Sequence, residues 1–165
     1  MSALDKPFRP VDRWFEAYAA DHQHPANQSL HVFCVPAIVW SILALLYVIP
    51  TPQFWRDPLP SEGVFAAVAA AMALFFWLRL SWTLGIGSLL LTAVSLWLAA
   101  TLAGAFGSMS LLWIAIAVFV IAWVGQFIGH HIEGRRPSFF TDLVYLLIGP
   151  PWVLAKVYRK VGLSY

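Results

Sequence analysis

The sequence contains few charged residues and a single cysteine. Asp, Glu, Lys and Arg make up 11% of its 165 residues, whereas hydrophobic residues make up 61%. A soluble domain carries about 25% charged residues, so this chain has too few to cover a surface that faces water. With Cys34 as the only cysteine, a disulfide framework is excluded as well. Together with a mean hydropathy of +0.75, the composition predicts an integral membrane protein.

A strong charge imbalance is also missing, and we expect no cleaved signal peptide among the first residues. The formal net charge is only +2, and Lys and Arg do not cluster with aromatic residues, which predicts no nucleic-acid partner. Residues 1–29 are polar and lack the apolar core of a cleaved signal peptide. We therefore expect them to form a polar N-terminal segment, with a helix on the cytoplasmic side.

Four apolar stretches are long enough to cross a bilayer, which takes roughly 20 residues. They lie at about residues 30–49, 64–80, 84–105 and 109–128. Pro36 should kink the first stretch or mark its start. A fifth stretch, residues 139–158, contains Gly149–Pro151, and its prolines predict two half-helices that re-enter the membrane or lie at its surface. The sequence thus predicts one all-α membrane domain over residues 1–165.

The basic residues predict the orientation of these four spans. With four spans, nine of the ten Lys and Arg residues lie on one side, as the positive-inside rule expects for the cytoplasm. Only Arg56 lies on the other side. A fifth span would move three C-terminal basic residues outside. We therefore predict cytoplasmic N- and C-termini, in a bacterial inner membrane or, in a eukaryote, the endoplasmic reticulum.

Two polar clusters, distant in sequence, should meet at this cytoplasmic face. The first lies in the segment from Tyr18 to His31, and the second ends the fourth span, from Gln126 to Glu133. Polar and ionisable groups at membrane depth usually face the interior of the helix bundle. A turn near Pro25 would let His22 fold back towards His31. Because the topology brings both clusters to one side, we expect them to form a single site.

The side chains in these clusters are those of a metal site. Two histidines and one carboxylate, with open positions left over, form the non-haem iron(II) arrangement. The spacing of the second cluster puts its glutamine, first histidine and glutamate on one stripe, with His131 about 100° away. The predicted ligands are His22, His31, His130 and Glu133, with His131 a weaker candidate. Three further residues should fix the imidazole tautomers: Tyr18, Asn27 and Gln126.

Other interpretations remain open. Arg135 and Arg136 fit an ordinary basic helix end at a membrane surface, and His24 fits an exposed loop. The chain could be a non-enzymatic membrane protein that transports or handles lipids or ions, with the histidines as a proton or ion site. It could also be a structural membrane subunit. A diiron site would need more than the five histidines present.

Two ordered motifs resemble a known family, the fungal endoplasmic-reticulum 2-hydroxy-fatty-acid dioxygenases and their bacterial homologues. The first is similar to the family pattern Tyr-x3-His-x4-Asn-x3-His-x4-Pro, and the second to Trp-x2-Gln-Phe-x-Gly-His-x2-Glu-x3-Pro. His131 departs from the second pattern, where the family has a smaller residue. The matching residues are Tyr18, His22, Asn27, His31 and Pro36, then Trp123, Gln126, Phe127, Gly129, His130, Glu133 and Pro137.

The resemblance implies an iron(II)-dependent oxygenase of α-oxidation that needs no 2-oxoglutarate. Its substrates would be O2 and a 2-hydroxy fatty acid, which leaves as an acid one carbon shorter. Membrane lipid would surround the acyl chain, and Arg135 or Arg136 could pair with the substrate carboxylate. The acyl chain length and the oligomeric state stay open.

Overall fold

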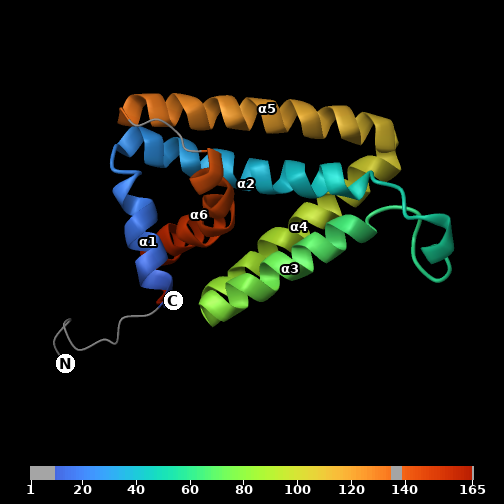
Figure 1. Ribbon diagram of the computed structural model, residues 1–165, viewed down its shortest axis with the longest axis horizontal. Helices are drawn as coiled ribbons and strands as arrows, with labels where there is room; N and C mark the ends of the chain where they lie inside the picture. Colours follow the sequence, from blue (N-terminus) through green and yellow to red (C-terminus); the bar gives the residue numbers. More distant parts are fainter. Residues whose placement is uncertain (1–9, 135–138, 165) are drawn as a thin grey trace.

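A computed structural model describes residues 10–134 and 139–164, with side chains described for residues 11–134 and 145–164. The described chain is all-helical and contains no strand, which confirms the all-α part of the predicted fold class. Figure 1 shows α2 and α5 side by side, with α1 and α6 at one end and the α3–α4 hairpin crossing beneath. The helices are α1 (Pro10–Ala20), α2 (Pro25–Tyr47), α3 (Val64–Leu80), α4 (Trp82–Phe106), α5 (Ser108–Glu133) and α6 (Phe139–Lys160).

Three of these helices are long and apolar enough to cross a membrane. They are α2, α4 and α5, with 23, 25 and 26 residues. The outer faces of α4 and α5 expose large apolar side chains such as Leu90, Trp97 and Ile121, as expected of a surface in contact with lipid. The remaining predicted span, residues 64–80, is α3 and has 17 residues, or about 26 Å of helix against a hydrocarbon core of about 30 Å. The four-span topology therefore stays a prediction.

Two spans extend further than their apolar stretches indicate. Helix α2 begins at Pro25 rather than near residue 30, and α5 continues to Glu133 rather than ending near residue 128. Hydropathy marks the membrane core, whereas a proline in the first turn and the His24 cap determine where α2 begins. Pro36 lies inside α2 and does not mark its start. Both extensions place polar residues of the two sequence motifs on regular α-helix.

Two glycines allow α2 and α5 to approach closely. A Cβ atom at Gly125 would lie 2.6 Å from Cys34 Sγ, and one at Gly129 would overlap Asn27 Oδ1. The glycines are four residues apart on one face of α5, the small-residue spacing that favours close helix packing in membranes. This contact brings the polar end of α5 against the polar start of α2.

Helix α6 differs from the predicted pair of half-helices. It is one helix of 22 residues with Pro150 and Pro151 inside it. A proline removes a backbone hydrogen bond, so the carbonyl four residues earlier loses its partner. For Pro151 that carbonyl belongs to Leu147, and Trp77 of α3 donates its indole N–H to it at 2.6 Å. Packing of the buried prolines and this tertiary hydrogen bond hold together a helix that its own backbone would interrupt.

Replacing Trp77 by phenylalanine should destabilise the protein by about 1–3 kcal/mol, because the partly buried Leu147 carbonyl would lose its donor. Thermal unfolding in detergent measures the effect. Trp97→Phe is the matched control, since Trp97 is 66% exposed on α4. Equal melting temperatures for the two variants would contradict the role given to Trp77.

Candidate metal centre

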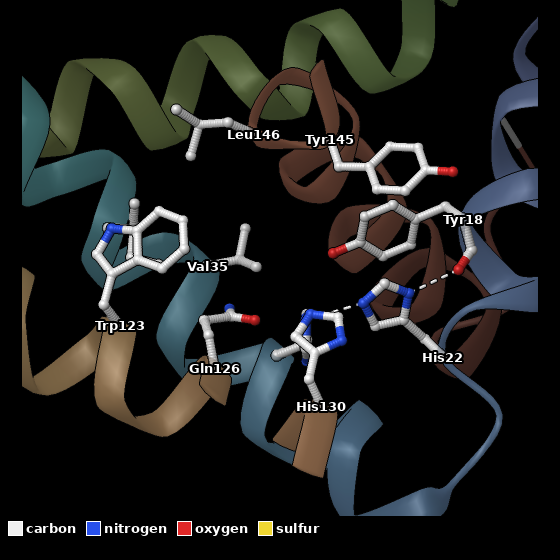
Figure 2. A pocket seen from close by; sticks show the side chains of 10 residues that line it. Tyr18, His22, Val35, Trp123, Gln126, His130, Tyr145 and Leu146 are labelled. Atoms are coloured by element: carbon white, nitrogen blue, oxygen red, sulfur yellow. Dashed lines mark hydrogen bonds between the residues drawn. The ribbon is translucent and has the colours of Figure 1, made fainter. Parts of the chain in front are cut away.

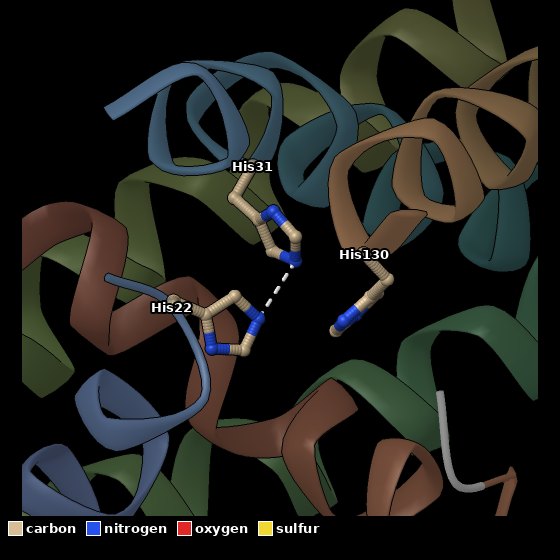
Figure 3. A group of neighbouring side chains, drawn as sticks. All are labelled: His22, His31 and His130. Carbon is tan, nitrogen blue, oxygen red and sulfur yellow. Dashed lines mark hydrogen bonds between the residues drawn. The ribbon is translucent and has the colours of Figure 1, made fainter. Parts of the chain in front are cut away.

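Three buried histidines from three segments converge at one end of the bundle. His22 lies in the turn after α1, His31 on α2 and His130 on α5. Each offers a ring nitrogen within 4.8 Å of the others, and the Nε2 atoms of His22 and His31 are 2.9 Å apart. Figure 3 shows the three rings pointing towards a common point. Among the described residues, this group has the composition and spacing of a metal site.

Local structure in the α1–α2 turn brings His22 to this point. Helix α1 ends with the His22 N–H donating to the Ala19 carbonyl at 3.1 Å. His24 then caps α2, since its Nδ1 accepts a hydrogen bond from the Ala26 N–H at 3.2 Å. The predicted return of His22 towards His31 is confirmed. His24 is exposed, as expected, and has this capping role in addition.

Backbone carbonyls determine the tautomers of two histidines. His22 Nδ1 lies 2.6 Å from the Tyr18 carbonyl oxygen, and His31 Nδ1 lies 2.9 Å from the Asn27 carbonyl oxygen. A carbonyl only accepts, so each Nδ1 carries the hydrogen and each neutral ring presents an Nε2 lone pair. The two lone pairs therefore face each other at 2.9 Å. Two lone pairs at this distance repel each other, and a cation bound to both nitrogen atoms would remove the repulsion.

The environment of His22 favours the neutral imidazole that a metal requires. Burial lowers the pKa of His22 below its usual value, which outweighs the opposing effect of the Tyr18 carbonyl. The Tyr18 ring stacks on His22 with their centroids 4.1 Å apart and their planes at 7°. This contact fixes the plane of the ring, as the carbonyl fixes its tautomer.

Glu133 lies outside the histidine group, although we predicted it as a ligand. Its carboxylate accepts hydrogen bonds from the backbone N–H groups of Gln23 and His24, both at 2.8 Å, and from Asn27 Nδ2 at 3.0 Å. Free N–H groups at a helix start attract a carboxylate. Glu133 thus joins the end of α5 to the start of α2. The sequence spacing of Glu133 and His130 predicted a shared helix face, but it gave no sign of the N–H groups that bind the Glu133 carboxylate.

The Glu133→Gln variant should bind metal about 10–100-fold more weakly, the usual effect of losing a group that orients the ligands. An amide cannot accept from all three donors at once, so the turn that carries His22 loosens. Titration of the protein with iron(II) measures the affinity. A loss as complete as in His130→Ala would contradict this positioning role and restore Glu133 as a ligand.

The other residues that we predicted for the site lie at different places relative to the three histidines. Gln126 is buried and faces a cavity of about 40 Å³ beside the histidines (Figure 2). His131 is exposed on α5, outside the histidine group. Arg135 and Arg136 lie outside the described residues. The cavity is lined by Tyr18, His22, His31, Val35, Ile38, Trp123, Gln126, His130, Tyr145 and Leu146.

Sequence reasoning missed a network that supports the His22 turn from α6. Lys156 Nζ donates to Gln28 Oε1 at 2.6 Å, and Gln28 Nε2 donates to the His22 carbonyl at 2.7 Å. The ammonium group also lies 3.8 Å from the centroid of the Trp152 ring, a cation–π contact. Burial, with Arg159 and Lys160 nearby, lowers the pKa of Lys156 to about 8. No local motif predicts this network, because α6 supplies half of it.

Comparison with known proteins identifies a family for this chain. The model of a protein family described as 2-hydroxy-palmitic acid dioxygenase Mpo1-like matches residues 8–161. No curated protein and no solved structure matches the chain. The matched range contains every residue of the histidine group.

Proposed function

The chain belongs to the 2-hydroxy-palmitic acid dioxygenase Mpo1-like family, and from this premise we propose that its buried histidines bind iron(II) for the α-oxidation of 2-hydroxy fatty acids. The observation that carries the proposal is the pair of Nε2 lone pairs, held 2.9 Å apart by backbone carbonyls, with His130 beside them. Neutral imidazoles are common ligands of iron. The proposed ligand set is therefore His22, His31 and His130.

The donor set also fits the reaction that the family name indicates. Three protein ligands leave coordination positions open, and iron(II) bound there would supply the redox chemistry for reaction with O2. A 2-hydroxy acid and one O2 contain the atoms of an acid one carbon shorter, CO2 and water, so no other oxidant is required. The hydroxyl and carboxylate of the substrate offer two oxygens for chelation, which an unsubstituted fatty acid lacks.

The chain's own residues would bind and orient the substrate head group. Figure 2 shows His22, His130 and the two tyrosines on one side of the cavity, and Val35, Trp123 and Leu146 on the other. A head group in this cavity would meet polar side chains, while its chain would leave along the apolar side. Trp123 and Val35 would also keep bulk water away from the reacting carbons.

The location of the site supports a substrate taken from the membrane. His31 and His130 lie near the ends of the candidate spans α2 and α5, where a lipid head group would be found. We place this end at the cytoplasmic face, according to the distribution of basic residues. Arg135 and Arg136, which follow α5 directly in the sequence, stay candidates for pairing with the substrate carboxylate.

The proposal is tested with purified protein loaded anaerobically with iron(II) and then exposed to O2 and 2-hydroxypalmitate. The expected result is conversion to the acid one carbon shorter, with palmitate left unchanged as the control substrate. Tight iron binding without turnover would favour a non-enzymatic protein that handles lipids or ions. Less than about 0.1 iron per chain would contradict the metal site itself.

A further inference from the structure

A second cavity, of about 150 Å³, lies among α2, α3, α4 and α6. Its lining is almost entirely aliphatic. The lining residues are Val39, Ile42, Leu43, Ala69, Ala70, Ala73, Trp77, Thr92, Leu146 and Leu147. An apolar site of about this volume can hold an apolar molecule such as benzene.

The two polar side chains in this lining already have hydrogen-bond partners. Trp77 donates its indole N–H to the Leu147 carbonyl at 2.6 Å. Thr92 donates its hydroxyl to the Ser88 carbonyl at 2.9 Å. Neither donor is left for a water molecule, and a buried water needs two to four polar partners. The cavity is therefore suited to a hydrocarbon occupant.

This cavity adjoins the one beside the histidines. Leu146 lines both. Helix α2 continues from one to the other, because Val35 and Ile38 line the first cavity while Val39 and Ile42 line the second. In Figure 2 Leu146 stands on the far side of the first cavity from His22 and His130. From His31 to Ile42 the helix rises by about 16 Å, and the side chains of α2 that line the two cavities along this length beyond His31 are apolar.

We propose that the 150 Å³ cavity binds the middle part of the substrate's acyl chain, and that Leu146 controls the passage into it. The inference rests on the proposed function, because it takes the head group to lie at the histidines. Each methylene group transferred from water into an apolar site strengthens binding roughly fourfold. The cavity would thereby select long-chain over short-chain 2-hydroxy acids.

A cavity-filling substitution with a matched control tests the acyl site. Ala73→Leu fills the cavity from α3, whereas Ala71→Leu adds the same atoms on the exposed face of the same helix. Ala73→Leu should raise KM for 2-hydroxypalmitate roughly tenfold or more, with unchanged KM for 2-hydroxyoctanoate and unchanged iron content. Ala71→Leu should behave as wild type. Equal KM values for the two variants, each with full iron content, would overturn the proposal.

Photolabelling tests the same site without turnover. A 2-hydroxy fatty acid with a diazirine at mid-chain should label the peptides that carry Ala73 or Leu146, and Ala73→Leu should reduce that labelling. Labelling confined to the outer face of α4, around Leu90 and Trp97, would overturn the acyl site even in an active enzyme. If the cavity is labelled but the protein has no oxygenase activity, the acyl site is supported and the proposed function is contradicted.

Discussion

Iron binding should be lost in His130→Ala and retained in His131→Ala. The two histidines are neighbours on α5, but only His130 is buried and belongs to the convergent group. His131 is exposed on the same helix. Removing a ligand should weaken iron binding well beyond the 10–100-fold typical of an outer-sphere partner. Turnover of 2-hydroxypalmitate should disappear with the iron.

Metal analysis after anaerobic loading and gel filtration measures this effect. Circular dichroism of both variants provides the control for folding, since the apolar packing of α2 against α5 does not depend on the imidazole. A His130→Ala variant that keeps wild-type iron would contradict the site. Loss of iron in His131→Ala would show that the residue that departs from the family motif is a ligand after all.

Gly129→Ala should both destabilise the protein and weaken its binding of iron. The new Cβ would overlap Asn27 Oδ1 and lie 3.2 Å from Asn27 Cγ, so the buried Asn27 side chain, which donates to Glu133, or the helix that carries it must shift. Overpacking of this kind usually costs about 1–3 kcal/mol. The Asn27 carbonyl also orients His31, so the displacement should disturb the metal site directly. We expect both a lower melting temperature and at least tenfold weaker iron binding.

Gly104→Ala is the matched control for this substitution. Gly104 lies inside α4, and a Cβ there would meet no atom within 4 Å. Alanine favours helix over glycine by up to about 1 kcal/mol, so this control should be neutral or slightly stabilising. If Gly129→Ala melts no lower than Gly104→Ala and binds iron as wild type does, the close α2–α5 contact is not what assembles the site.

The sequence predicted the histidine convergence because two independent patterns agreed. The number of spans predicted that the Tyr18–His31 and Gln126–Glu133 segments lie at the same membrane face. The turn near Pro25 predicted that His22 folds back towards His31. The structure brings these histidines together. Tyr18 and Asn27, which we predicted to fix the imidazole tautomers, have their backbone carbonyls against the Nδ1 atoms of His22 and His31.

The remaining features depend on contacts that no local pattern encodes. Glu133 has the spacing of a ligand, but the free N–H groups of Gln23 and His24 bind its carboxylate instead. The prolines of α6 predict a break, yet Trp77 from α3 supplies a donor to the orphaned carbonyl. The contact between α5 and α2 is the exception, because Gly125 and Gly129 are four residues apart in the sequence and this small-residue spacing could have predicted it.

X-ray absorption spectroscopy at the iron edge of the loaded wild-type protein tests the central claim most directly. The tautomers of His22 and His31, with His130 beside them, predict scattering from three imidazole rings at the iron. Glu133, bound to backbone N–H groups, should contribute none. A spectrum that requires only two imidazoles and a protein carboxylate, or that shows iron without imidazole, would contradict the three-histidine site.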